Sequence, residues 1–169
     1  MEKQIFAILF IFSTVFCLPE LDYINVLRAK HNAPPLQYNT TLAKSSNQWA
    51  YYLSSISSLV HSGGFVGENL GLIYFNENST INIINLWYNE KIHYDYSKPG
   101  FTYETGHFTQ LVWKNTKSVG FGISIDAKTN YIYMVMQFYP PGNVQNEFKY
   151  NVLNDGVDRT TKFTCKCKC

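Results

Sequence analysis

The chain has 169 residues, a length that suits one folded domain. Apolar residues make up 46% of it and charged residues only 15%, which indicates a globular protein and excludes a disordered one. The net charge is +2, and no run of lysine and arginine is interleaved with aromatic residues, which argues against nucleic acid as a partner.

Residues 1–17 have the pattern of a secretory signal peptide. Lys3 gives a weakly positive start, and the apolar run from Ile5 to Cys17 is too short to span a bilayer as a helix. The alternative is a buried amino-terminal helix. Sequons for N-glycosylation at Asn39 and Asn78 agree with the secretory route. No other stretch is long enough to cross a membrane, so we expect a secreted, extracellular protein without a transmembrane anchor.

Hydrophobic periodicity predicts three helices followed by a hairpin. Apolar residues recur three or four apart in residues 18–36, 40–58 and 79–96, which is typical of amphipathic helices. Residues 118–127 and 130–140 are rich in β-branched and aromatic residues and are separated by a short polar turn, which predicts an antiparallel hairpin. Helices combined with a hairpin indicate a mixed α and β layered domain.

His107 is the first residue that raises a question of chemistry. It stands in a Gly-His-Phe-Thr sequence, directly before an aromatic and aliphatic run. A neutral imidazole is costly to bury without partners. His107 could be a core histidine, a metal ligand or a catalytic base, and its own neighbours in sequence do not decide between these roles.

Several blocks of the chain resemble, in order, the motifs of the CAP superfamily, which includes cysteine-rich secretory proteins, antigen five and plant pathogenesis-related proteins. These blocks are HSGGFVGENLG, LWYNE, YDYSKPGFTYETGHFTQLVWKNTKSVGFG and MQFYPPGNV. The stretch from Tyr94 to Trp113 is most similar to the secreted sterol-binding CAP proteins of fungi. The resemblance implies an α+β fold, a three-layer α-β-α sandwich.

The same resemblance implies a central cleft built from four residues. Matched motif by motif, they are two histidines and two glutamates: His61, Glu68, Glu90 and His107. His31 and His93 are left out of this set, because His31 ends the first predicted helix, where a capping or packing role is expected, and His93 has no partner motif.

The chemistry of this tetrad remains open at the level of sequence. Two imidazoles with carboxylates nearby could bind Zn²⁺ weakly, with His61 and His107 as ligands. The same groups could perform acid–base catalysis, because neighbouring carboxylates and imidazoles separate one another's pKa values. They could also form a hydrogen-bonded cluster that orders the loops of the cleft. No serine or cysteine nucleophile motif accompanies the histidines, so we assign no catalytic residue.

A second candidate site is the loop that contains Tyr94, Tyr96 and Phe101. In the fungal relatives this loop is the implied sterol site. Aromatic rings offer flat apolar surface, and tyrosine adds a hydroxyl that can bind the single hydroxyl of a sterol. The alternative is that these rings pack the loop onto the domain.

The cysteines concentrate at the end of the chain. Cys17 would leave with the signal peptide, and the other three are Cys165, Cys167 and Cys169. Because a bridge between residues two apart is strained, we expect exchange between chains and a fraction of disulfide-linked homodimer. The predicted organisation is a signal peptide at 1–17, a CAP domain at 18–150 and a tail at 151–169.

The function that these observations favour is a secreted, non-enzymatic lipid-binding protein. It would bind sterol at the aromatic loop, with fatty acid as a further possible ligand, and a divalent metal such as Zn²⁺ in the cleft. The alternatives are a hydrolase that uses the His/Glu cleft and a signalling ligand that binds a protein surface.

Overall fold

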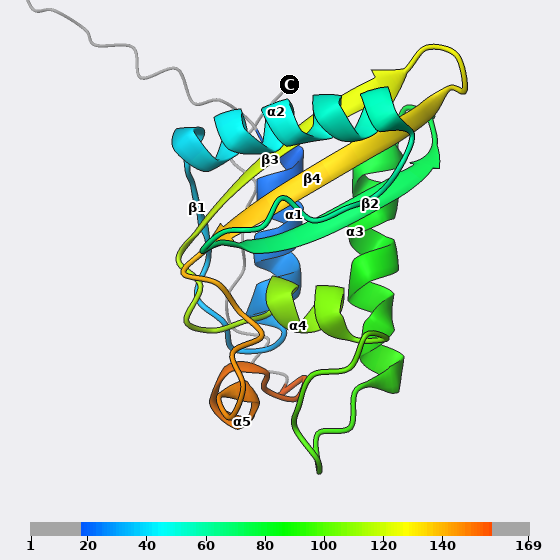
Figure 1. Cartoon of the computed structure of the whole chain (residues 1–169). Helices are drawn as coiled ribbons and strands as arrows, with labels where there is room; N and C mark the ends of the chain where they lie inside the picture. Colours follow the sequence, from blue (N-terminus) through cyan, green and yellow to red (C-terminus); the bar gives the residue numbers. More distant parts are fainter. Residues whose placement is uncertain (1–17, 157–169) are drawn as a thin grey trace, which may run out of the picture.

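The computed structural model describes residues 18–156, in which helices pack on both faces of one sheet (Figure 1). The predicted signal peptide and the three tail cysteines lie outside the described residues. The elements in chain order are α1 (Pro19–Ala29), β1 (Gln37–Tyr38), α2 (Thr40–Ile56), β2 (Gly67–Tyr74), α3 (Ser79–Asn89), the 3-10 helix η1 (Glu90–His93), α4 (Gly106–Leu111), β3 (Ser118–Asp126), β4 (Tyr131–Tyr139) and α5 (Phe148–Asn151).

The sheet has the strand order β1-β3-β4-β2. β3 and β4 form the predicted antiparallel hairpin, in which Ser118 lies opposite Tyr139. β2 pairs antiparallel with the other side of β4, and the short β1 pairs parallel with β3. β4 is therefore a central strand, and its residues 132–138 are all buried.

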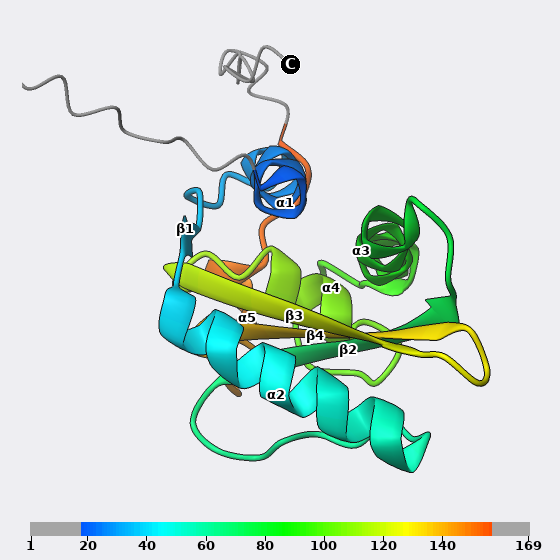
Figure 2. The ribbon, with the colours of Figure 1, turned by 90° about the horizontal axis from the view of Figure 1, so that it is seen from above.

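The sheet is the middle layer of three. Viewed along the sheet, α2 covers one face, whereas α1, α3 and α4 lie on the other (Figure 2). The larger core lies between the sheet and the α1, α3 and α4 layer, and the smaller core lies under α2. This arrangement confirms the α-β-α sandwich. Within residues 18–156, no helix combines the length and the apolar character needed to cross a membrane.

α2 lies unusually close to β3 because two glycines face it. The first turn of α2 is capped by Asn39, whose side-chain oxygen accepts hydrogen bonds from two backbone N–H groups. On β3, a Cβ atom on Gly120 would lie 2.1 Å from the backbone nitrogen of Ala43, and one on Gly122 would lie 2.2 Å from the backbone nitrogen of Asn47. The absence of side chains at Gly120 and Gly122 thus allows the backbones of β3 and α2 to pack against each other.

Arg28 joins α1 to the segment after α4. Its guanidinium is fully buried and donates to backbone carbonyl oxygens of Leu111 (2.7 Å), Trp113 (3.0 Å) and Thr116 (3.2 Å), while its Nε donates to Pro34 (2.9 Å). No carboxylate pairs with it within the described part of the chain. Burial lowers the pKa of Arg28 to about 9, so the group is still charged at neutral pH.

The structure differs from the sequence prediction in its short elements and in several boundaries. β2 and α4 were not predicted as elements, and the third helix ends as an α-helix at Asn89 before one 3-10 turn. Asn151 and Val152, which the prediction assigned to the tail after residue 150, are buried. Element type in the long periodic segments was predicted correctly, whereas short elements and boundaries were not.

Candidate functional site

The first half of the cleft is a pair formed by His61 and Glu68. His61 lies in the loop between α2 and β2, and Glu68 is the second residue of β2. The Nδ1 atom of His61 lies 2.9 Å from Oε1 of Glu68, whose side chain is only 6% exposed, against 65% for His61. Glu68 also accepts hydrogen bonds from the N–H and hydroxyl groups of Ser62 and from the amide of Gln137. The carboxylate is thus fixed, and the imidazole projects from it.

The second half is a pair formed by His107 and Glu90. Oε1 of Glu90 lies 2.6 Å from Nδ1 of His107, and Oε2 accepts from the backbone N–H groups of His107 and Phe108, both at 3.0 Å. These N–H groups belong to the first turn of α4, where backbone donors have no partner within the helix. The ring of His107 also stacks on Trp87, with centroids 5.9 Å apart. His107 is therefore held from two sides.

Both imidazoles line one hollow of about 370 Å³. Glu68 also lines it, whereas Glu90 lies behind His107. The structure thus brings three members of the predicted tetrad to one surface and places the fourth as a support. The remaining lining residues are Asn69, Phe101, Tyr103, Gly106 and Asn143.

Sequence reasoning missed four polar residues of this site. Ser62 and Gln137 donate hydrogen bonds to Glu68. Gln137 lies in the apolar run of β4, and nothing in that run indicates a polar contact with the cleft. Asn69 donates to the backbone oxygen of His107, and Asn143 bridges Thr109 and the backbone of α4. Asn69 and Asn143 stand in the GENL and PPGN blocks, so the motifs could have indicated them.

The two pairs leave the same atom of each histidine free. A carboxylate only accepts hydrogen bonds, so in the neutral form of each ring Nδ1 carries the proton and Nε2 has the lone pair. An Nε2 lone pair can ligate a metal ion or accept a proton. Ser62 donates to Glu68 and not to an imidazole, so it does not form the serine–histidine pair that nucleophilic catalysis needs.

The structure separates the three residues of the predicted sterol loop. Tyr94 is 8% exposed and belongs to the larger core, where its ring contacts Tyr96 at 4.9 Å and Phe108 at 5.9 Å between centroids. Phe101 is 51% exposed and pairs with Tyr103 at the hollow. Tyr94 and Tyr96 therefore pack the loop onto the domain, while Phe101 borders the cleft.

The hydroxyl group of Tyr94 has an unusual environment. It is buried and makes no hydrogen bond of full geometry among residues 18–156, although the backbone N–H of Gly100 lies close enough to lower its pKa. Burial, with a smaller contribution from Tyr96, raises the pKa of Tyr94 to about 12, an effect that the nearby backbone of Gly100 only partly offsets. An unpaired buried hydroxyl costs about 1–3 kcal/mol relative to one that is hydrogen-bonded.

The other predicted positions lie away from the cleft. His31 is buried, in agreement with a packing role, and His93 is exposed on the outer side of η1. Asn78 is exposed, whereas Asn39 is half-buried and caps α2. Glycosylation at these two asparagines stays a prediction.

Comparison with known proteins decides the family. Residues 21–138 match the family described as "CAP: Cysteine-rich secretory protein family". The chain belongs to this family. The matched range contains the whole His/Glu tetrad and the aromatic loop, so both candidate sites lie within the CAP domain.

Two curated relatives differ in how much of their length this chain matches. Protein PRY2 of Saccharomyces cerevisiae is 41% identical over 130 residues, which cover 76% of this chain and 38% of the relative. Golgi-associated plant pathogenesis-related protein 1 of Homo sapiens is 38% identical over 135 residues, which cover 76% of this chain and 86% of the relative. The chain thus matches nearly all of the human protein but well under half of the yeast one.

A solved structure of NaASP2 with Zn²⁺ has the same fold. It superposes with a TM-score of 0.62 at 20% identity and covers 80% of this chain and 84% of that protein. At this identity the likeness establishes the CAP fold and not a shared ligand.

Proposed function

We propose that this CAP protein is secreted, is not an enzyme, and binds a sterol through the loop of Tyr94, Tyr96 and Phe101. The observation that carries the proposal is the unpaired hydroxyl of Tyr94 among aromatic rings. A sterol has one hydroxyl group and a rigid apolar body. Its hydroxyl would satisfy the Tyr94 oxygen, and its rings would contact the aromatic side chains.

Access to Tyr94 requires the loop to shift, because the hydroxyl is buried. Directly after Tyr94 the chain makes a turn in which Asp95 accepts hydrogen bonds from the N–H and hydroxyl groups of Ser97. These bonds are internal to the turn, so the turn can move as a unit while they stay intact. Phe101 follows this turn and lines the hollow, so it is the ring through which a bound sterol would contact the cleft side.

Secretion is supported by the apolar run near the amino terminus and by the family to which the chain belongs. The hydrolase alternative would use His61, His107 and a glutamate of the cleft, and Ser62 adds no nucleophile to this set, because its hydroxyl donates to Glu68. A protein-signalling role would be favoured if purified protein carried no lipid.

Removing only the hydroxyl group of Tyr94 tests the sterol site. We expect Tyr94→Phe to raise the dissociation constant for labelled cholesterol about fivefold, the equivalent of one hydrogen bond of about 1 kcal/mol. The ring stays in the core, so the stability of the ligand-free protein should not fall. Tyr51→Phe, which removes a hydroxyl group from an exposed tyrosine on α2, is the control and should bind within twofold of the wild type.

Phe101→Ala tests the apolar contact without opening the core, since the ring is half-exposed. We expect Phe101→Ala to bind sterol more weakly than the wild type, with an unchanged circular dichroism spectrum. Palmitate as a competitor separates a sterol site from a fatty-acid site. Normal cholesterol binding by both Tyr94→Phe and Phe101→Ala would move the ligand site elsewhere.

The cleft is proposed to bind Zn²⁺ weakly through Nε2 of His61 and His107. The fit rests on the donor set, because both imidazoles line one hollow and both have Nδ1 held by a carboxylate. Within residues 18–156, no group of three or more histidine, cysteine or acidic side chains is arranged to hold a metal. Two protein ligands imply weak binding, and NaASP2 shows that a protein of this fold has been solved with Zn²⁺.

Zinc binding should weaken as the pH falls, because a protonated imidazole cannot ligate. We expect calorimetric titration to detect Zn²⁺ at neutral pH and to lose it at mildly acidic pH. His107→Ala and His61→Ala should each reduce the affinity, whereas His93→Ala should not. Equal zinc affinity in the His61→Ala, His107→Ala double variant would contradict this assignment.

A further inference from the structure

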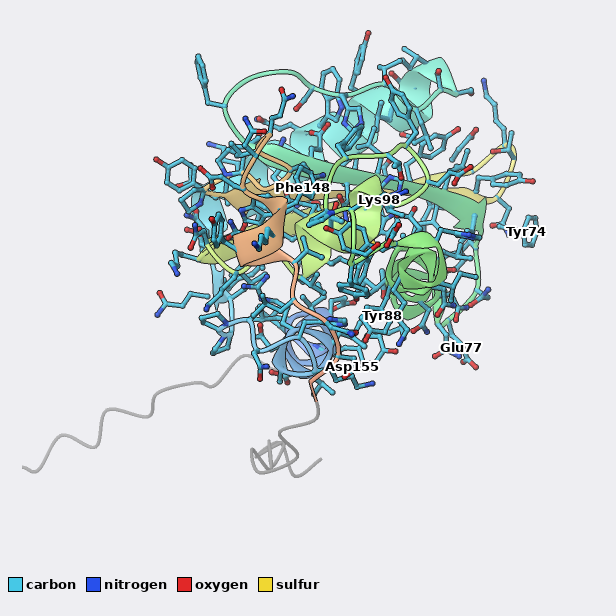
Figure 3. All side chains as sticks on the ribbon, turned by 90° about the horizontal axis from the view of Figure 1, so that it is seen from below. Tyr74, Glu77, Tyr88, Lys98, Phe148 and Asp155 are labelled. Atoms are coloured by element: carbon cyan, nitrogen blue, oxygen red, sulfur yellow. The ribbon has the colours of Figure 1, made fainter. Side chains whose placement is uncertain are left out.

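One exposed stretch of the chain contains no charged residue. Between Lys44 and Glu68 the sequence has no aspartate, glutamate, lysine or arginine, although charged residues make up 15% of the chain. The stretch comprises the second half of α2 and the loop that leads to β2. In Figure 3, α2 and this loop lie on the side of the sheet opposite Tyr88 and Asp155. They therefore form an outer face of the molecule to which the chain contributes no fixed charge.

Most of residues 45–66, which we call the uncharged surface, are exposed to solvent. The exposed large apolar side chains of this surface are Tyr51, Tyr52, Ile56, Leu59, Val60 and Phe65. The other exposed residues are serines, one asparagine, one glutamine, His61 and two glycines. Aromatic rings are thus mixed with neutral hydroxyl and amide groups. Such a surface avoids the largest desolvation penalty when an apolar phase covers it, because no fixed charge has to leave water.

Trp49 joins the helix and the loop into one surface. Its indole Nε1 donates to the backbone oxygen of Val60 at 2.9 Å, and its ring contacts that of Tyr52 with centroids 4.8 Å apart. Further along the loop, the backbone N–H and hydroxyl groups of Ser62 donate to Glu68. The loop is therefore attached to α2 on one side and to the cleft on the other.

Phe65 projects into solvent from the last part of this loop. Its ring is 94% exposed. It follows Gly63 and Gly64, whose φ angles of 74° and 100° are readily adopted by glycine and are costly for other residues. Gly64 and Val66, its neighbours, line a hollow of about 250 Å³ to which His61 also contributes. The most exposed ring of the uncharged surface thus lies next to the cleft.

The chemistry of this surface fits a lipid bilayer. Aromatic rings are enriched where proteins meet the boundary between lipid and water, whereas charged groups are costly to bury there. A specific protein partner is commonly matched through complementary charges, and the uncharged surface offers none. The surface also reaches His61, which lines the same hollow as Phe101 of the proposed sterol loop. A sterol is itself a bilayer lipid, so the partner and the proposed ligand come from the same source.

We propose that the uncharged surface docks this protein on the interface of an electrically neutral lipid bilayer. Tyr51 and Phe65 enter the headgroup region, while the neutral polar side chains stay hydrogen-bonded to water or to headgroups. The cleft then lies close to the membrane, and a sterol passes between bilayer and protein over a short path. The choice of a bilayer as partner rests on the proposed sterol function, whereas docking itself needs no sterol.

Binding of the full chain to phosphatidylcholine vesicles without sterol, measured by co-sedimentation, tests the docking. We expect Phe65→Ser and Tyr51→Ser each to lower the partition coefficient about fivefold, because each removes a ring that is buried at the interface. Both side chains are exposed in the free protein, so neither change opens the core. Tyr150→Ser is the matched control. This tyrosine on α5 is 69% exposed, against 71% for Tyr51, and its variant should bind within twofold of the wild type.

A charge placed within the surface gives a second readout. Ser55 is exposed and lies one helical turn after Tyr51 and Tyr52. Ser55→Lys and Ser55→Glu should both weaken binding to the neutral vesicles, since a charge of either sign has to be dehydrated. Raising the salt concentration should not weaken binding of the wild type, because no ion pair contributes to it.

Three results would overturn the docking. They are wild-type protein that does not bind these vesicles, a Tyr51→Ser, Phe65→Ser double variant that binds them equally well, and weakening by only one sign of charge at Ser55, which would indicate a charged protein partner. A wild-type dimer that Phe65→Ser dissociates would assign the surface to a second copy instead. Cholesterol binding without vesicles reports on the sterol site separately. We expect the double variant to retain it, so a failure of docking is distinguishable from a failure of the proposed function.

Discussion

Replacing Arg28 by methionine is expected to lower the free energy of unfolding by about 3–5 kcal/mol. Methionine fills a similar volume but leaves the carbonyl oxygens of Pro34, Leu111, Trp113 and Thr116 without their donor. Buried acceptors that lose their partner cost more than the original hydrogen bonds contributed. The loss should be larger than for most single substitutions.

Denaturant unfolding followed by tryptophan fluorescence measures this effect. Lys44→Met is the matched control, because it removes a positive charge from an exposed position on α2 and should change stability by less than about 0.5 kcal/mol. Arg28→Lys keeps the charge but cannot reach four carbonyls, so its stability should lie between those of the wild type and Arg28→Met. A loss below about 1 kcal/mol for Arg28→Met would show that the carbonyls find other donors.

Gly120→Ala is expected to destabilise the protein by about 3 kcal/mol, although it adds only one methyl group. The new Cβ atom would lie 2.1 Å from the nitrogen of Ala43 and 2.5 Å from the carbonyl carbon of Leu42. Both are backbone atoms of α2, so no side-chain rotation relieves the clash. The helix has to move away from β3, which loosens the smaller core beneath it.

Thermal unfolding compares this variant with Gly100→Ala. A Cβ atom on Gly100 meets no atom closer than 4.0 Å, and its backbone is not in the left-handed region, so alanine is tolerated there. Stability equal to the wild type for Gly120→Ala would mean that α2 is not packed as closely as described. An equal loss of thermal stability in both variants would indicate a general effect of replacing glycine.

The long elements could be predicted from sequence because their periodicity is strong. The hairpin of β3 and β4 and the starts of α2 and α3 follow directly from the pattern. β2 was missed because Gly67, Gly71 and two polar residues interrupt it. Those residues have reasons that only the fold reveals: a side chain on Gly67 would strike Gln110, one on Gly71 would strike Ile83, and Glu68 is needed in the cleft. α4 has too few residues to show a helical period.

The site was predictable in composition but not in geometry. The motif resemblance named both His/Glu pairs, which the structure places in hydrogen-bond contact. It could not tell that Tyr94 points into the core and Phe101 toward the cleft, because aromatic spacing in a loop does not specify direction. Nor could it show that Gln137 of β4 lies directly opposite Glu68 of β2, since the two strands are far apart in sequence.

The two histidines of the cleft differ in how firmly they are held, and this sets an order of events. His107 stacks on Trp87 and lies on a helix, whereas the far more exposed His61 stands in a loop beside two glycines with positive φ angles. A ligand that bridges both will engage His107 first at little entropic cost. The second contact is then intramolecular, so its strength depends on the effective concentration of His61 near the bound ligand. Changes in the length or stiffness of the His61 loop should therefore alter the dissociation rate of a bridging ligand more than its association rate.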